Sequence, residues 1–218
     1  MTNSEILSHV DHTLLKNVAT WEQIKTLCED AIKYNTASVC IPPCYVKRVH
    51  EAFPNLDVCT VVGFPLGYET LAGKIADTKA CLEDGASEID MVINICEVKN
   101  GNYDIVSEEI SELRKVCKDK ILKVIIETCY LTDEEKVKLC EIVTEAGADY
   151  IKTSTGFGTN GATLSDIELF KKNIGENVKI KAAGGIRSVD AATEYLNAGC
   201  DRIGASAVLE EIKKEGKK

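Results

Sequence analysis

The chain has 218 residues and a formal net charge of −9, with 44% hydrophobic and 28% charged residues. This length fits one large domain or two small ones, and the composition is ordinary for a globular protein with a sizeable core. The acidic balance argues against a surface for nucleic acid or an anionic membrane, although a local cluster of lysines and amides can still hold a small anionic substrate. No secretory leader or apolar stretch of membrane length is recognisable, so we expect a cytoplasmic protein.

Ten cysteines and three histidines raise the question of disulfides or a metal site. No C-x-x-C pair occurs, and Cys40 and Cys44 have the closest spacing. A disulfide framework is not expected without a secretory signal. His9 and His12 are separated by two residues in a predicted strand, which is not the spacing of helical zinc ligands. We therefore expect neither a metal nor a cofactor, and we interpret most of the cysteines as small core residues.

Short apolar runs alternate with amphipathic stretches along the whole chain. They predict eight strands, at residues 9–15, 37–41, 57–62, 88–94, 122–128, 149–154, 178–183 and 202–205. Three of the helical stretches begin with a capping-box pattern, at residues 20–23, 132–135 and 165–168. No linker or low-complexity segment divides the chain, so we expect one domain over residues 1–218 with a frayed tail from Lys213.

The order of these elements predicts the fold class. Runs that are almost continuously apolar, such as 91–93 and 124–126, are typical of parallel strands covered by helices. Eight βα units of about 27 residues favour a closed (β/α)8 TIM barrel, slightly tighter than the usual size of about 250 residues. An open doubly wound sheet is the competing architecture. In a barrel, the active site is expected at the C-terminal ends of the strands.

A weak internal repeat indicates which strand positions are equivalent. It occurs three times, in segments 83–89, 145–151 and 197–203. Each copy places a glycine where a helix ends, since glycine permits the left-handed turn, and an isoleucine in the strand that follows. The residues after these isoleucines, with the equivalent residue of a degenerate fourth copy that turns at Asn35, are Asp90, Lys152, Gly204 and Cys40. If the isoleucines face the helices, alternation along a strand makes these four residues face the lumen.

Charged residues on lumen-facing strands are the main sign of catalysis. Lys152 lies in the sixth predicted strand and Lys181 in the seventh, so a barrel brings the two amines together. A neighbouring cation and partial desolvation both favour a neutral amine, which can attack a carbonyl and form a Schiff base. Asp90 can then transfer protons, directly or through a water. The alternative is a buried ion pair between Asp90 and one lysine, but two lysines and an aspartate favour catalysis.

Glycines after the seventh and eighth predicted strands indicate a phosphate site. Barrels often bind phosphate at these loops, where backbone N–H groups can approach an anion. The residues concerned are Gly184, Gly185, Gly204 and Ser206. The alternative is that the glycines only permit tight turns. Two further matches are discounted, because 156–161 fits G-x-G-x-x-G after the wrong strand and 67–74 has the wrong spacing for a P-loop.

Taken together, four motifs resemble those of the deoxyribose-phosphate aldolase family. They occupy residues 11–14, 88–94, 152–156 and 181–187, and the resemblance extends over about residues 5–212. It implies a metal-free class I aldolase that reversibly cleaves 2-deoxy-D-ribose 5-phosphate into acetaldehyde and D-glyceraldehyde 3-phosphate, in deoxyribonucleotide catabolism. The expected partners are small sugar phosphates and aldehydes, not nucleic acid or membrane. A homodimer and a homotetramer are both left open.

The resemblance also implies residue roles. Lys152 matches the Schiff-base lysine, Lys181 the lysine that perturbs it, and Asp90 the proton-transfer residue. The phosphate-loop positions are matched by Gly184, Gly185, Gly204 and Ser206. Of the remaining site positions, those near the sugar hydroxyls are Asp11 and Thr13, and the one at the edge is Cys40. Glu127 is expected to support the lysine pair electrostatically or to neutralise it.

Some positions depart from the family pattern. Phe157 and Ala207 stand where some members have a lysine and a second serine, and the tail has no tyrosine. These departures concern phosphate affinity and tail-assisted proton transfer rather than the reaction class.

Two other functions fit the same residues. One is a different barrel aldolase, or a transaldolase-like enzyme, acting on another sugar phosphate. The other is a non-enzymatic barrel that binds a sugar phosphate or pyridoxal phosphate, in which Lys152 only captures an aldehyde. Acceptance of acetaldehyde as donor distinguishes a deoxyribose-phosphate aldolase from the first alternative. Turnover of the deoxyribose phosphate by a colourless protein excludes the pyridoxal phosphate version.

Overall fold

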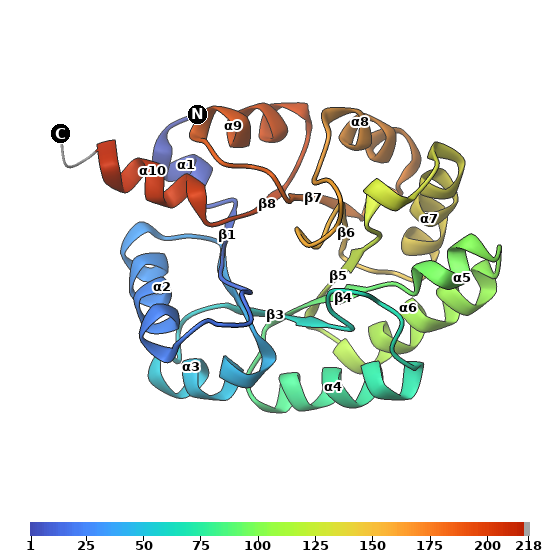
Figure 1. Cartoon of the computed structure of the whole chain (residues 1–218), viewed down its shortest axis with the longest axis horizontal. Helices are drawn as coiled ribbons and strands as arrows, with labels where there is room; N and C mark the ends of the chain where they lie inside the picture. Colours follow the sequence, from blue (N-terminus) through green and yellow to red (C-terminus); the bar gives the residue numbers. More distant parts are fainter. Residues whose placement is uncertain (216–218) are drawn as a thin grey trace.

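Parallel strands pair in chain order from β1 to β8, and β8 closes on β1 to complete a barrel. The computed structural model describes residues 1–215. Within them the strands are β1 (Val10–Thr13), β2 (Ser38–Ile41), β3 (Val58–Val62), β4 (Glu88–Val92), β5 (Ile121–Ile125), β6 (Tyr150–Lys152), β7 (Lys179–Ala183) and β8 (Arg202–Ala205). Helices surround these strands (Figure 1). The predicted single-domain (β/α)8 barrel is therefore confirmed, and the open sheet is wrong.

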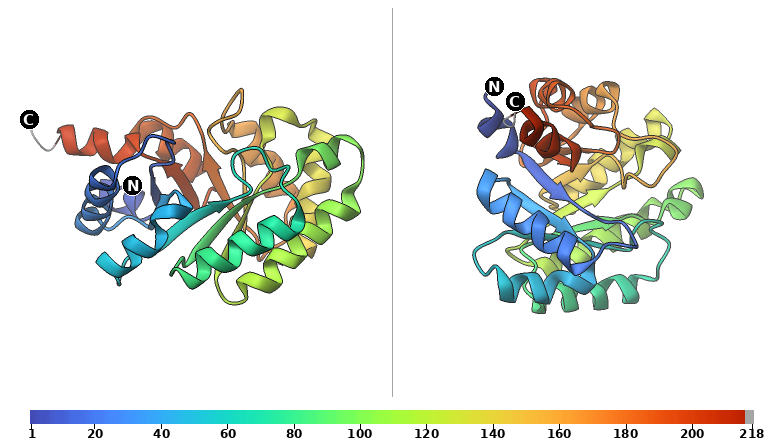
Figure 2. Two further views of the ribbon diagram at one scale, coloured as in Figure 1. Left: turned by 60° about the horizontal axis from the view of Figure 1, so that its bottom comes forward. Right: turned by 60° about the vertical axis from the view of Figure 1, so that its left-hand side comes forward.

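The helices lie along the outside of the strands, as the two side views in Figure 2 also show. They are α1 (Asn3–Leu7), α2 (Trp21–Tyr34), α3 (Val46–Ala52), α4 (Leu71–Glu83), α5 (Ile95–Lys99), α6 (Tyr103–Cys117), α7 (Asp133–Glu145), α8 (Leu164–Asn173), α9 (Val189–Ala198) and α10 (Ala207–Glu215). Short 3-10 helices, η1 (Pro43–Tyr45) and η2 (Thr128–Tyr130), follow β2 and β5. None of the helices in the described part of the chain is long and apolar enough to cross a membrane.

Two of the three predicted capping boxes are confirmed. Thr20 caps α2 and Thr132 caps α7, each with the reciprocal bond from the third helical residue. The third prediction is wrong, because α8 begins earlier and its N-cap is Thr163, whose hydroxyl accepts from the backbone N–H of Asp166 at 3.1 Å. The chain is extended at Thr163 and helical after it, so Ser165 falls inside the first turn.

The internal repeat has the predicted structural meaning. Its three glycines have positive φ angles, between 71° and 115°, and Asn35 has a φ of 52°. The apolar positions Val39, Ile89, Ile151 and Ile203 belong to the core between barrel and helices. A second, smaller cluster of Cys40, Cys59 and Val61 fills part of the lumen. Side-chain alternation along each strand thus separates an apolar outer core from a lumen that carries the polar residues.

The C-terminal end of the described chain is helical. Helix α10 packs beside α1 and α9, and it continues to Glu215. Lys213 Nζ donates to the Asp30 carboxylate of α2 at 2.7 Å. The first three residues of the expected frayed tail are therefore part of a helix, whereas residues 216–218 lie outside the described residues.

Candidate active site

The two lysines singled out by the sequence are direct neighbours. Lys152 and Lys181 are register partners in the parallel pair β6–β7. Both Nζ atoms donate to the same oxygen, Oδ2 of Asp90, at 2.6 Å each. Asp90 reaches them from β4 on the other side of the lumen, and all three side chains are buried. The geometry predicted from strand order and repeat register is confirmed for this trio.

Lys181 continues into a second set of charges. Its Nζ also donates to Oδ2 of Asp11 on β1. The other oxygen of Asp11 accepts from Arg202 on β8 at 2.5 Å, and Arg202 contacts Glu88 at 3.3 Å. Sequence reasoning did not single out Arg202 or Glu88, although their positions, at the first residue of β8 and of β4, made both candidates for the lumen.

Lys123 on β5 connects these charges back to Asp90. Its Nζ donates to Glu88 at 2.5 Å and to Oδ1 of Asp90 at 2.9 Å. The side chain is fully buried beside Tyr150, which lies opposite Lys123 in the register of β5 and β6. Sequence analysis missed Lys123 as well. The available signal was a lysine inside the apolar run of β5, the same signal that drew attention to Lys152.

The protonation states in this cluster follow from its contacts. Burial alone raises the pKa of Asp90, but Lys123, Lys152 and Lys181 together hold it well below the usual value. For Lys181, burial lowers the pKa, yet Asp11 and Asp90 outweigh it, and the pKa rises above the usual value. These directions favour an ionised carboxylate at Asp90 and an ammonium group at Lys181, beside Lys152.

A cavity of about 290 Å³ opens above Lys152 at the C-terminal ends of the strands. Residues predicted for sugar or phosphate binding line it, namely Thr13, Gly184, Gly185, Gly204 and Ser206. Gly184 and Gly185 have φ angles of 81° and 80°, which favour glycine, so their role in the loop is also conformational. Arg187, the last residue of the 181–187 motif, lines the same cavity, and the sequence analysis assigned it no role. It adds a cation near the phosphate loops.

Two predicted substrate contacts lie deeper than expected. Asp11 is fully buried below the cavity, where Ser38 Oγ donates to its carboxylate at 2.8 Å in addition to the bonds from Lys181 and Arg202. It shares the lumen face with Thr13 but sits one layer lower in β1. Cys40 is also fully buried, because Leu15 and Phe64 pack over its cluster. Neither residue lines this cavity.

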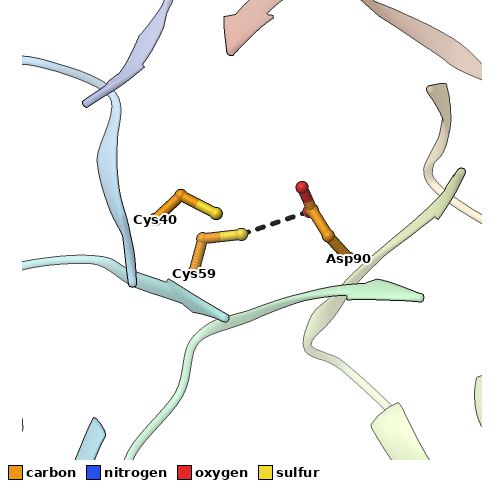
Figure 3. A group of neighbouring side chains, drawn as sticks. All are labelled: Cys40, Cys59 and Asp90. Carbon is orange, nitrogen blue, oxygen red and sulfur yellow. Dashed lines mark hydrogen bonds between the residues drawn. The ribbon is translucent and has the colours of Figure 1, made fainter. Parts of the chain in front are cut away.

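Cys59 is a further lumen residue that the sequence did not reveal. It pairs in register with Cys40, and the two thiols lie close together (Figure 3). Its Sγ donates to Oδ1 of Asp90 at 3.1 Å. Burial raises the pKa of the Cys59 thiol well above its usual value, and the adjacent carboxylate adds to the shift. Cys59 is thus a neutral donor that helps to fix Asp90.

Two sets of side chains are close enough to hold a metal ion. They are Cys40, Cys59 and Asp90, and Asp11, Cys59 and Glu88. Both sets are part of the charged cluster, where lysine and arginine groups already donate to the carboxylates. A metal ion would have to replace these cations and would be repelled by those that remain. The donor set therefore fits a cluster of ion pairs better than a metal centre.

Glu127 has a different environment from the one expected. Its carboxylate accepts from the backbone N–H of Thr155 at 3.2 Å and from the Thr155 hydroxyl. Burial raises the pKa of Glu127 in spite of these hydrogen bonds, which lower it. Glu127 thus holds the loop after β6 at the cavity rim, and its effect on Lys152 is a longer-range one.

This arrangement can carry out amine chemistry on a carbonyl compound. Of the lysines in the charged cluster, Lys152 is the one that lines the cavity. Asp90 is an ionised proton acceptor in contact with its amine. The far wall of the cavity consists of loops suited to an anion. No part of this chemistry requires a redox group.

The comparisons with known proteins agree with this geometry. A protein of Clostridium botulinum (strain Alaska E43 / Type E3) described as deoxyribose-phosphate aldolase is 64% identical, covering 99% of this chain and 98% of the relative. One from Clostridioides difficile (strain 630), with the same description, is 54% identical over 96% of both. The tetrameric deoxyribose phosphate aldolase structure from Aeropyrum pernix has a TM-score of 0.91 at 31% identity, covering 98% and 93%. Residues 6–211 match the DeoC/LacD family of aldolases, and the chain therefore belongs to that family.

Proposed function

We propose that this protein catalyses the reversible cleavage of 2-deoxy-D-ribose 5-phosphate into acetaldehyde and D-glyceraldehyde 3-phosphate. The observation that carries the proposal is the position of Lys152, whose amine lines the cavity while its Nζ contacts a carboxylate shared with Lys181. The relatives described as deoxyribose-phosphate aldolases support the choice of substrate.

The reaction begins when the neutral amine of Lys152 attacks C1 of the open-chain sugar. The carbinolamine takes up a proton at its hydroxyl, loses water and becomes an iminium ion. As a proton leaves the C3 hydroxyl, the electrons of the C2–C3 bond move into the iminium, and C3 becomes the aldehyde carbon of glyceraldehyde 3-phosphate. The enamine that remains on Lys152 takes a proton at C2, and water then releases acetaldehyde and the free amine.

Asp90 serves the proton transfers in this scheme. It is ionised, and its Oδ2 is already hydrogen-bonded to the Nζ of Lys152 at 2.6 Å. It can therefore accept the proton that the amine loses, directly or through a water. Lys181 supplies a positive charge beside the reacting nitrogen, because it donates to the same oxygen of Asp90.

The phosphate group of the substrate fits the opposite wall of the cavity. Gly184, Gly185 and Gly204 expose backbone there, Ser206 adds a hydroxyl, and Arg187 adds a cation. Backbone N–H groups and a guanidinium are suited to a phosphate dianion. This anchor would place the other end of the sugar toward Lys152.

A trapping experiment tests the assignment of Lys152. Borohydride reduction in the presence of 2-deoxy-D-ribose 5-phosphate or acetaldehyde should leave a stable adduct on Lys152, located by peptide mass spectrometry. A coupled assay for glyceraldehyde 3-phosphate should show turnover without added metal or pyridoxal phosphate. Label on another lysine, or turnover that is confined to a different sugar phosphate, contradicts the proposal.

The proposal also includes an assembly and a location. We infer a homo-oligomer, a dimer or a tetramer, because the Aeropyrum pernix relative is described as tetrameric. Light scattering after size-exclusion chromatography distinguishes these from a monomer. The small-molecule substrate is consistent with a cytoplasmic location, which cell fractionation can check.

A further inference from the structure

The charged residues beneath Lys152 form a closed ring in which cations and anions alternate. Going around it, each residue contacts the next, in the order Asp90, Lys181, Asp11, Arg202, Glu88, Lys123 and back to Asp90. We call these six residues the charge ring. They come from β1, β4, β5, β7 and β8, so the ring spans most of the barrel lumen.

The charge ring is electrically balanced without Lys152. It contains three carboxylates and three cations. Lys181 and Arg202 each contact two of the carboxylates, and Lys123 contacts all three. Lys152 is attached from outside, through the single oxygen Oδ2 of Asp90 that Lys181 also uses. When Lys152 is protonated, its positive charge therefore has no counter-charge left within this cluster.

The side chains of the charge ring are buried, and this strengthens the effect of their charges on Lys152. Five of the ring's side chains are exposed by 4% or less, and that of Arg202 by 11%. Water screens such charges poorly, so the net charge of the ring acts on Lys152 across the whole lumen.

We propose that Lys123, Arg202 and Glu88 are positioning residues whose charges, acting through Asp90 and Lys181, set how readily Lys152 loses its proton. They do not touch the cavity, and their effect is exerted by the net charge of the ring. This inference rests on the proposed role of Lys152 as nucleophile.

Other groups face Lys152 and have to stay constant in a test. Besides Asp90 and Lys181, they are Glu127 after β5, Cys40 on β2 and Arg187 at the cavity wall. Arg202 and Glu88 do not contact Lys152, whose hydrogen-bond partner is Asp90, so substitutions there do not remove a direct contact of the Lys152 amine.

The test measures the reactivity of Lys152 itself as a function of pH. Acetaldehyde condenses with the neutral amine and releases water, and cyanoborohydride delivers hydride to the iminium carbon to give a secondary amine. The rate of this labelling at Lys152, followed by mass spectrometry, rises with pH as the amine becomes neutral. Its midpoint in each variant reports the charge environment of the nitrogen.

The ring predicts opposite shifts for opposite changes. Arg202→Gln gives the ring a net charge of −1, which favours protonated Lys152, so the midpoint moves to higher pH by about one unit. Glu88→Gln gives +1 and moves the midpoint to lower pH by a similar amount. Arg202→Lys keeps the charge and is the matched control, with a midpoint close to that of the parent protein.

The double variant Glu88→Gln/Arg202→Gln separates charge from contacts. It loses both ion pairs but restores a neutral ring, so its midpoint returns toward the parent value. Three results overturn the proposal. The midpoints of the single variants do not move, both single variants move in the same direction, or the double variant stays shifted. If Arg202→Gln does not fold, Lys123→Met removes a ring cation at another point and makes the same prediction.

This experiment is independent of the natural substrate. The trapping reagent is acetaldehyde with cyanoborohydride, so the midpoints can be measured whether or not the protein cleaves 2-deoxy-D-ribose 5-phosphate. Shifted midpoints without sugar cleavage support the ring and contradict the proposed substrate. Sugar cleavage with unshifted midpoints supports the proposed substrate and contradicts the role of the charge ring.

Discussion

Lys74 and Lys152 are both buried lysines that contact a carboxylate, yet the barrel surrounds them in different ways. Lys74, on α4, donates to the Gly67 carbonyl at 2.6 Å, to the Val92 carbonyl at 2.7 Å and to Glu109 at 2.5 Å. Its three N–H donors are all used, and Glu109 neutralises its charge. Within residues 1–215, Lys152 has a single hydrogen-bond partner, Asp90, and its amine lines the cavity.

The difference shows that burial alone does not make a lysine reactive. Lys74 is a fully satisfied group that ties the loop after β3 to the end of β4, and the other oxygen of Glu109 accepts from the backbone N–H of Asn94 at 3.0 Å. Lys152 retains donors without partners, shares its counter-ion with Lys181 and faces open space. Unused hydrogen-bonding capacity, an uncompensated charge and access to a cavity distinguish a nucleophile from a structural ion pair.

The largest effect is expected for Lys152→Met. The variant has no amine to form the Schiff base, so kcat/KM should fall by at least about 10³-fold. Because the substitution removes a buried polar group, and Asp90 keeps Lys123 and Lys181 as partners, the thermal midpoint should stay the same or rise. Coupled-assay kinetics and thermal unfolding of the same preparation check both parts. Substantial remaining activity would show that another residue provides the amine.

Lys181→Leu should cause the next largest loss. It removes the cation beside Lys152 and leaves Lys123 as the lysine that Asp11 and Asp90 still share, so we expect kcat/KM to fall by about 10² or more at neutral pH. The circular dichroism spectrum should remain that of a folded barrel. Near-normal turnover at neutral pH contradicts the assigned role of Lys181.

Lys74→Met should affect stability rather than chemistry. It leaves Glu109 as a buried carboxylate without its partner, so the free energy of unfolding should fall by about 3–5 kcal/mol. Activity per folded molecule should stay within a few-fold of the parent, since Lys74 does not contact the cavity. Urea unfolding and active-site titration measure the two quantities. Loss of activity in fully folded protein would break the comparison between the two lysines.

The smallest effect is expected when a lysine is added at an exposed position. Phe157 is 55% exposed on the loop after β6 and packs edge-on against Phe64, with ring centroids 5.3 Å apart. Phe157→Lys should lower KM for the phosphorylated sugar by a few-fold, and only at low ionic strength, because exposed charges are screened by salt. Phe157→Met is the neutral control. A salt-independent change would point to loop packing instead of charge.

Much of the site was predictable from local patterns. The period of the apolar residues distinguishes strands from helices, and the repeat's glycine and isoleucine positions set the register of each strand relative to its preceding helix. Since side chains alternate along a strand, this was enough to place Asp90, Lys152, Gly204 and Cys40 in the lumen. Chain order then brought Lys152 and Lys181 together, because consecutive strands of a βα barrel are neighbours.

Only the tertiary structure decided how deep each residue lies and which charges meet. Arg202 and Glu88 are separated by 114 residues, and Lys181 and Asp11 by 170, so their contacts depend on barrel closure and strand stagger. The same stagger puts Asp11 below the cavity and Thr13 at its edge, although both occupy the lumen face of β1. Local sequence encodes the face of a side chain, whereas its depth and its partners are properties of the closed barrel.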